Sequence, residues 1–399
     1  MSERRRPSRV ASLAARRIQQ RQFASLAWRI DVRGETVDAG DIGWRDHAES
    51  VAMTGGEIYR IYSMTKPVVS FRILQLIEAG RLALDSPVGD WMPGFDRMSV
   101  LRRDGRTERL QRRITVEDLL THRAGLSYDF LPDCPLATLY REAHLVTDAS
   151  RSLSELVQAL AEYPLAFQPG ERWYYSYATD VLGHLIEYVC DRPLDEDLEQ
   201  ALFAPLGMVD TAFHVPDDKR ARLVAMYGGR GLGEPPTSFD TRNELTPVDV
   251  EDSHPSDRRA GFLRGGFGLF STIDDYCLFI RIMKKGVDAA GREYLGSELV
   301  DCLWQNRLPA AQRPLHIYGD PYSGYGWGLA GRIMVDIDEA DVVTVPGEGG
   351  WSGAASTWFW IDRANDTSGV IMTQFLGSSV AIGAQMQSAF YMEDSGAQG

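Results

Sequence analysis

The chain contains very little lysine. Four of its 399 residues are lysines (Lys66, Lys219, Lys284 and Lys285), against 38 arginines, so arginine supplies nearly all of the positive charge. Arginine does not lose its proton in a protein, whereas a buried lysine can become a neutral base. Lys66 is the only lysine in the first 218 residues, and it stands three positions after Ser63. This placement indicates a need for an amine that can deprotonate at that point.

Cysteines are few, and long apolar runs are missing. Cys134, Cys190, Cys277 and Cys302 lack the C-x-x-C or paired-histidine spacing of a disulfide framework or a zinc site. No apolar run approaches the roughly 20 residues that span a bilayer. The formal net charge of −14 argues against nucleic acid and membrane as main partners. The composition predicts a cytoplasmic protein with reduced thiols, no metal and no cofactor.

The order of predicted elements indicates an α+β fold with an antiparallel sheet flanked by helices. Alternation predicts a hairpin over 23–46, and β-branched or aromatic runs predict strands over 331–336, 341–345, 354–361 and 369–375. Because strands gather at the two ends of the chain, an antiparallel sheet is favoured over a βαβ array. We predict an α/β domain from 1–84 plus 262–399, an inserted helical domain from 85–261, and an active site at their interface.

Helices are predicted at 63–80 and 380–391, and two further segments need comment. The first 21 residues are locally basic and are predicted to hold a solvated helix that caps the domain. The loop 228–256 is rich in proline and glycine and is a candidate lid over a pocket.

Three short segments could carry chemistry. On a helix, Ser63 and Lys66 share one face, where a neutral amine can activate the hydroxyl as a nucleophile. Tyr175 precedes a second apolar helix, and its phenol could take or relay the serine proton. Glycines around Trp351 open a predicted edge strand, whose N–H groups could form an oxyanion hole with that of Ser63. His122 has no G-x-S-x-G elbow to pair with and is predicted to be structural.

These segments resemble a known family in residues and in order. Ser63-Met64-Thr65-Lys66-Pro67, Tyr175-Ser176-Tyr177 and Trp351-Ser352-Gly353 are similar to motifs of the serine β-lactamases and penicillin-binding proteins, and most similar to those of family VIII carboxylesterases. The resemblance covers most of 15–392 and implies a class C β-lactamase fold. Further matching segments are Tyr59-Arg60-Ile61, Leu119 to Leu126, Asp180-Val181-Leu182-Gly183 and Gly265 to Thr272.

The resemblance also implies roles for individual residues. Ser63 would be the acylated nucleophile, and Lys66 and Tyr175 would deprotonate it and then protonate the leaving group. The N–H groups of Ser63 and Ala354 would hold the oxyanion. For deacylation, Tyr175 or Lys66 would activate water.

Two departures from the family motifs concern the substrate. Members that act on β-lactams carry asparagine where this chain has Tyr177, and Lys-Thr-Gly where it has Trp351-Ser352-Gly353. Trp351 in place of lysine removes a cation that binds the substrate carboxylate, and Tyr177, Trp351, Ser352 and Gly353 become the predicted substrate-binding wall. We therefore predict a serine carboxylesterase that acts through an acyl-enzyme on neutral short- to medium-chain esters.

Three alternatives remain open. The same acyl-enzyme could serve an amidase, a D-aminopeptidase-like enzyme or a weak β-lactamase. It could also transfer the acyl group to an alcohol. Finally, the fold could serve as a ligand-binding or sensor domain without activity.

Overall fold

The computed structural model describes residues 7–131, 134–145, 148–228, 245–258, 262–317 and 320–394. Its centre is an eight-stranded sheet with the order β11-β12-β13-β14-β15-β1-β2-β3, and every neighbouring pair in it is antiparallel. The predicted antiparallel sheet is therefore confirmed. Its strands are β1 (Ser25–Val32), β2 (Glu35–Asp46), β3 (Val51–Ala52), β11 (Tyr325–Trp327), β12 (Arg332–Met334), β13 (Gly349–Ser352), β14 (Trp358–Asp362) and β15 (Thr367–Met372).

The two ends of the chain meet at the β1–β15 pair. β1 turns into β2 through Arg33 and Gly34, which both have positive φ (53° and 86°), as a two-residue hairpin turn of type I′ requires. β15 then pairs with β1 along its length, from Ala27 opposite Met372 to Val32 opposite Thr367. The N-terminal hairpin thus completes a sheet that the C-terminal strands begin.

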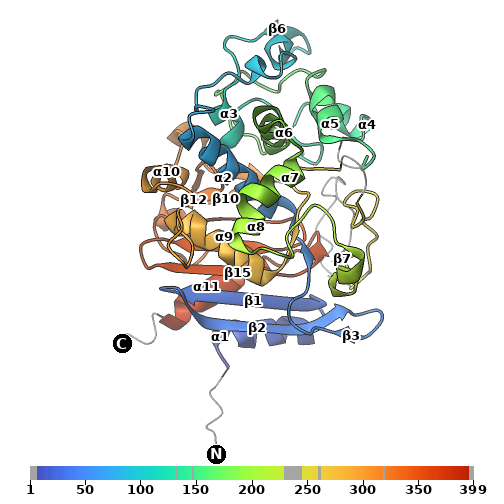
Figure 1. Cartoon of the computed structure of the whole chain (residues 1–399), viewed down its shortest axis with the longest axis vertical. Helices are drawn as coiled ribbons and strands as arrows, with labels where there is room; N and C mark the ends of the chain where they lie inside the picture. Colours follow the sequence, from blue (N-terminus) through green and yellow to red (C-terminus); the bar gives the residue numbers. More distant parts are fainter. Residues whose placement is uncertain are drawn as a thin grey trace, which may run out of the picture.

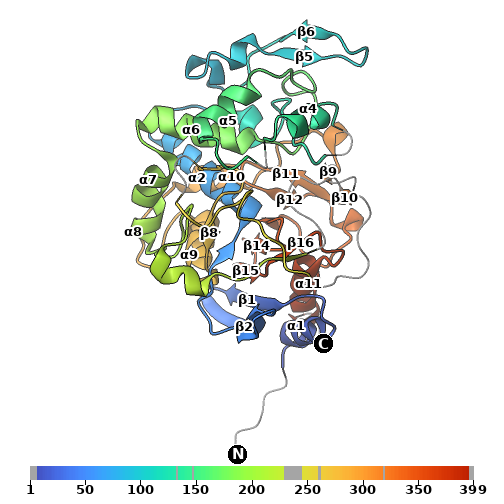
Figure 2. The same ribbon diagram turned by 90° about the vertical axis from the view of Figure 1, so that its right-hand side faces the viewer.

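Alternate residues of these strands face two different layers. Leu26, Trp28 and Ile30 of β1 are buried with α1 (Arg9–Gln19) and α11 (Ile382–Asp394) on one face. Ala27 of β1 belongs to the main core, which includes residues of α9 (Ile273–Lys285) on the other face. This period of two follows from the pleat of a strand. Figure 2 shows α1 and α11 next to each other, to the right of β1 and β2.

Two details of the predicted strands are wrong. The run 341–345 forms no strand, because the Val343 N–H donates to Ser388 Oγ of α11 (3.0 Å). Pro346 follows, and proline has no N–H to continue a ladder. In addition, β13 is not at the edge of the sheet, since it pairs with both β12 and β14.

The middle of the chain is mainly helical, and its helices between residues 116 and 190 lie at the opposite end of the molecule from β1 and β2 (Figure 1). α2 (Thr65–Glu78) runs between this helical layer and the sheet, and its side chains are buried on nearly all sides. The division into two domains at 84/85 and 261/262 stays a prediction. The helices of this middle part are α3 (Val116–Leu120), α4 (Ala137–Glu142), α5 (Leu153–Leu160), α6 (Ala178–Cys190), α7 (Leu194–Leu198) and α8 (Ala204–Leu206), with a small hairpin of β5 (Ser99–Leu101) and β6 (Thr107–Arg109).

The remaining described helices and strands are short connections, apart from one helix beside α9. They are β4 (Tyr59–Arg60), β7 (Tyr227–Gly228), β8 (Phe270–Ser271), α10 (Ser297–Leu303), β9 (Leu315–Ile317), β10 (Asp320–Tyr322), β16 (Phe375–Leu376) and several single-turn helices.

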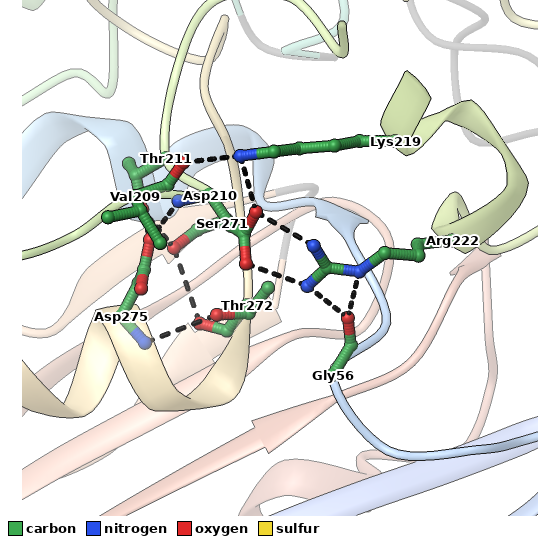
Figure 3. Close-up of polar contacts among 9 residues, drawn as sticks. All are labelled: Gly56, Val209, Asp210, Thr211, Lys219, Arg222, Ser271, Thr272 and Asp275. Atoms are coloured by element: carbon green, nitrogen blue, oxygen red, sulfur yellow. Dashed lines mark hydrogen bonds and ion pairs between the residues drawn. The ribbon is translucent and has the colours of Figure 1, made fainter. Parts of the chain in front are cut away.

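A polar network fastens the segment after the helical layer to the sheet side of the molecule (Figure 3). Asp210 is bound by both Lys219 Nζ (2.8 Å) and Arg222 Nη2 (2.7 Å). Arg222 also donates through Nε to the carbonyl of Gly56 (2.8 Å). The Asp210 N–H donates to Asp275 at the start of α9 (2.7 Å). The network therefore connects the segment 210–222 to the loop at Gly56 and to the start of α9.

The predictions for the two chain ends and for the loop 228–256 have different outcomes. The expected N-terminal helix is α1, whose Ser8 side chain accepts the Ala11 N–H and whose last turn carries Arg16 and Arg17. The C-terminal helix also forms, two residues later than predicted. Most of the candidate lid, 229–244, lies outside the described residues. In the described part of the chain, no helix is both long and apolar enough to cross a bilayer.

Candidate active site

Ser63 sits in a tight turn directly before α2. The preceding residue, Tyr62, has a positive φ of 43°, which costs energy for a residue with a side chain. Its buried ring packs edge-on against His254, with ring centres 4.8 Å apart, and this packing holds the turn. Ser63 is partly exposed and lines a cavity, whereas Lys66, one helical turn later, is buried. The predicted pair therefore shares one helix face.

Three oxygens surround the Lys66 amine. Nζ lies 3.3 Å from Ser63 Oγ, 3.0 Å from Tyr128 Oη and 2.8 Å from the Gly266 carbonyl oxygen. A carbonyl oxygen can only accept, and a phenol oxygen can also accept, so these two can hold the two N–H bonds of a neutral amine. The nitrogen lone pair is then left for the Ser63 hydroxyl. This geometry suits an amine that receives the serine proton.

Burial makes such a neutral amine accessible near neutral pH. Desolvation lowers the pKa of Lys66 from 10.5 to about 7, while the charge of Asp180 acts in the opposite direction. The phenol of Tyr128, which also contacts this amine, stays protonated because burial raises its pKa well above the usual value. The charge of Lys66 therefore changes in the neutral pH range.

Tyr175 lies beside the Lys66 amine and presents its aromatic ring to it. Lys66 Nζ is 4.4 Å from the centre of the Tyr175 ring. The Tyr175 hydroxyl accepts a hydrogen bond from the indole N–H of Trp351 (3.0 Å). The structure thus brings Tyr175 and Trp351 together at the cavity, as the sequence predicted for both. The Tyr128 hydroxyl lies within hydrogen-bond distance of Lys66 Nζ (3.0 Å).

Sequence reasoning missed Tyr128 and Gly266. Tyr128 follows the matching segment Leu119 to Leu126 by two residues, in the short aromatic run Tyr128-Asp129-Phe130. Gly266 lies inside another matching segment but was given no role. An aromatic run directly after a helix and a glycine pair in a loop were the available signals, and neither specifies a partner 62 or 200 residues away.

The proposed oxyanion side of the site depends on a close approach of two backbones. A Cβ on Gly353 would lie 2.3 Å from the carbonyl oxygen of Ile61 and 2.3 Å from Thr357 Oγ1, so only glycine fits there. This contact brings the end of β13 against the turn that carries Ser63. Ala354 and Ser63 consequently line the same cavity, which is the placement that a shared oxyanion hole needs.

The cavity measures about 380 Å³ and is mostly apolar. Among the described residues, none of the side chains that line it is charged. Aromatic and aliphatic side chains form the wall near Ser63, and small residues before and at the start of α11 form the far wall. The first group is Tyr62, Tyr128, Phe130, Tyr175, Phe267, Ile317, Tyr322 and Trp351, and the second runs from Gly377 to Ala384.

The predicted substrate-binding residues divide into two groups. Trp351, Ser352 and Gly353 line the cavity. Tyr177 does not, because it is fully buried behind Tyr128, with ring centres 4.3 Å apart. His122 is also buried, and its Nδ1 lies 3.1 Å from Ser176 Oγ, so it has a structural partner. In the described part of the chain, no cluster of three potential metal ligands is found.

A serine and a buried lysine one helical turn apart, beside two phenols and between a helical layer and an antiparallel sheet, define the class of serine β-lactamase-like hydrolases. The comparisons agree with this class: residues 10–387 match the Beta-lactamase family, and the chain belongs to that family.

Curated relatives cover most of the chain. Protein Rv1367c of Mycobacterium tuberculosis is 31% identical over 350 residues, which is 86% of this chain and 82% of the relative. Esterase EstB of Burkholderia gladioli is 27% identical over 408 residues, covering 96% of both. Among solved structures, EstCE1, described as a hydrolase with promiscuous acyltransferase activity, has a TM-score of 0.80 at 23% identity and covers 96% of this chain and 97% of its own. The β-lactamase-like fold is therefore confirmed.

Proposed function

We propose that the protein is a serine carboxylesterase that hydrolyses neutral short- to medium-chain esters through an acyl-enzyme at Ser63. The observation that carries this proposal is the buried Lys66 amine, 3.3 Å from Ser63 Oγ, with a pKa near 7. Membership of a family with an esterase relative, EstB, supports it.

The reaction begins with the transfer of the Ser63 proton to Lys66 Nζ as Oγ bonds to the acyl carbon. The carbonyl oxygen becomes negative and accepts hydrogen bonds from the N–H groups of Ser63 and Ala354. The proton then passes to the leaving alkoxide, and Tyr175, whose phenol lines the cavity, relays it. A water molecule, deprotonated by Lys66 or Tyr175, attacks the acyl group and releases the acid.

The walls of the cavity favour neutral substrates. A carboxylate on the acyl chain would have to leave water for a space in which no charged side chain of the described residues meets it. Burying an unpaired charge is far more costly than burying a methyl group. Trp351 stands where the resembling motif of β-lactam-cleaving enzymes has a lysine, so the loss of that cation adds to the expected preference for neutral esters.

Two matched measurements test the proposal. Ser63→Ala should lose about 10⁴-fold or more in kcat/KM for p-nitrophenyl butyrate. In the wild type, a fluorophosphonate should phosphonylate Ser63 with loss of HF, so the peptide that contains Ser63 should gain the mass of the phosphonyl group. Ser70→Ala is the control, because Ser70 is buried on the same helix but does not line the cavity. Retained activity in Ser63→Ala would contradict the mechanism.

The second measurement compares a negatively charged ester with a neutral ester of similar size. p-Nitrophenyl hemisuccinate differs from the butyrate by a carboxylate in place of the terminal methyl group. We expect about 100-fold lower kcat/KM for the hemisuccinate. Equal rates for the two esters would refute the neutral-substrate part of the proposal and leave the acyl-enzyme intact.

Acyl transfer to an alcohol is the second candidate. The cavity extends from Ser63 to the start of α11, which leaves apolar room for an acceptor beside the acyl chain. EstCE1 is described as having promiscuous acyltransferase activity. The ratio of ester formed to acid formed, measured with increasing concentrations of an aliphatic alcohol, separates the two activities.

A further inference from the structure

Asp180 is a buried carboxylate behind the Lys66 amine. It lies in the first turn of α6 and is fully buried. Its Oδ1 accepts the Gly266 N–H (3.0 Å). Its Oδ2 has no hydrogen-bond partner among the described residues. A buried carboxylate with an unused oxygen is costly, so its presence beside an active amine requires an explanation.

Gly266 connects Asp180 to Lys66. Its N–H donates to Asp180, and its carbonyl oxygen lies 2.8 Å from Lys66 Nζ. A Cβ on Gly266 would lie 2.5 Å from Asp180 Oδ2 and 2.9 Å from Tyr128 Oη. Both oxygens therefore converge on one backbone position, and the absence of a side chain there lets the carboxylate approach the amine.

We propose that Asp180 is a positioning residue for Lys66, which holds the Gly266 segment that binds the amine and stabilises the ammonium formed when Lys66 takes the Ser63 proton. The inference rests on the proposed function, because it assigns a partner to the same base. The proton moves between Ser63 Oγ, Lys66 Nζ, the Tyr175 phenol and the leaving alkoxide, and Asp180 neither gains nor loses one. Its part is that of the buried carboxylate behind the base in a catalytic triad.

Among the described residues, few other charged groups could stabilise the Lys66 ammonium. Burial keeps Tyr128 and Tyr177 neutral by raising their pKa values and keeps His122 neutral by lowering its pKa. Burial raises the pKa of Asp180, and the charges of Lys66 and Arg264 and the Gly266 N–H oppose this shift. The buried carboxyl group of Asp129, which follows Tyr128 in the chain, has a pKa raised by burial to about 7. The groups that face Lys66 or Asp180 are Ser63, His122, Tyr128, Tyr175, Tyr177 and Arg264.

Asp180→Asn tests the inference in the full-length enzyme. The amide oxygen can still accept the Gly266 N–H, so the fold is retained while the charge is lost. Because that charge raises the pKa of Lys66, its removal should move the acidic limb of the kcat/KM profile to lower pH by about one unit, and plateau kcat/KM should fall roughly tenfold to hundredfold. The profile is measured with p-nitrophenyl butyrate from pH 4 to 9.

One control variant and one alternative variant separate a structural role of Asp180 from the proposed role. Asp275→Asn removes another buried carboxylate that accepts a backbone N–H (2.7 Å), on a helix that contributes no described residue to the cavity, and its profile should match the wild type. Asp180→Ser removes the same charge and leaves room for water, and it should shift the limb in the same direction if the asparagine variant does not fold.

The outcomes are distinct. An unshifted or raised limb in a folded Asp180 variant, with kcat/KM within twofold of the wild type, would overturn the inference. If instead Ser63→Ala is as active as the wild type, the proposed function itself fails, whatever the Asp180 variants show.

Discussion

Replacing Lys66 by arginine keeps a positive charge at the site and removes a buried amine that can become a neutral base in the neutral pH range. In the wild type, a pKa of about 7 means that about one-tenth of the amine is neutral at pH 6 and about nine-tenths at pH 8. We therefore expect wild-type kcat/KM to rise about tenfold between these pH values and then to level off. The direction follows from the base being active only when unprotonated.

Lys66→Arg should lose about 10³-fold in kcat/KM or more at every pH, since a guanidinium does not accept the serine proton. The assay is hydrolysis of p-nitrophenyl butyrate, with circular dichroism to confirm folding. Lys284→Arg is the matched control, because Lys284 is also a buried lysine but pairs with Asp366 (2.8 Å) away from the cavity. A flat wild-type profile between pH 6 and 8, or a Lys66→Arg variant within tenfold of the wild type, would refute the reasoning.

Three further variants have definite expectations. Tyr128→Phe removes one of two oxygens that orient the Lys66 amine and should lower kcat/KM about tenfold with little change in KM; no change would show that the hydroxyl is dispensable. Gly353→Val places a Cβ 2.3 Å from a carbonyl oxygen, so fluorophosphonate labelling should be lost, and normal labelling would contradict the close approach. Asp210→Asn should reduce the free energy of unfolding by about 1–2 kcal/mol in urea titrations, since it weakens two partly exposed ion pairs; an unchanged midpoint would show that the network adds nothing.

The same Asp210 pairs give a pH dependence of stability. Hydrogen bonding to Arg222 and Lys219 holds the pKa of Asp210 below its usual value against a smaller effect of burial. A depressed carboxyl pKa adds stability above the unfolded-state value and loses it as the pH falls. The wild type should therefore lose more stability than Asp210→Asn when the pH is lowered below about 4.

The sequence could predict those parts of the site that depend on local geometry. Ser63 and Lys66 are three residues apart on a helix, and that spacing alone places them together. The segregation of strands at the two chain ends likewise predicted the sheet. The strand predicted at 341–345 failed because β-branched residues describe a preference, whereas the partner of the Val343 N–H is set by the docking of α11.

Contacts between distant segments could not be predicted in the same way. Tyr175 and Tyr128 are both phenols near the amine, and only the packing of the Tyr128 loop against Gly266 decides which hydroxyl reaches it. Tyr177 illustrates the same limit. It stands two residues from a cavity residue, yet the first turn of α6 directs it into the core behind Tyr128.

The scarcity of lysine has a physical consequence at Asp180. Two buried basic residues, Arg264 and Lys66, act on this carboxylate, and only Lys66 can lose its proton. Arg264 is fully buried, and burial lowers its pKa, yet an arginine remains protonated in a protein. Its constant charge favours the ionised form of Asp180. Lys66 is buried to a similar degree, but its amine can release a proton near pH 7. In the proposed mechanism, the permanent charge of Arg264 opposes the effect of burial on the pKa of Asp180, so that the carboxylate can act on Lys66 while Lys66 alternates between base and acid. Exchanging the two residue types would leave the net charge of the site unchanged and remove its ability to move a proton.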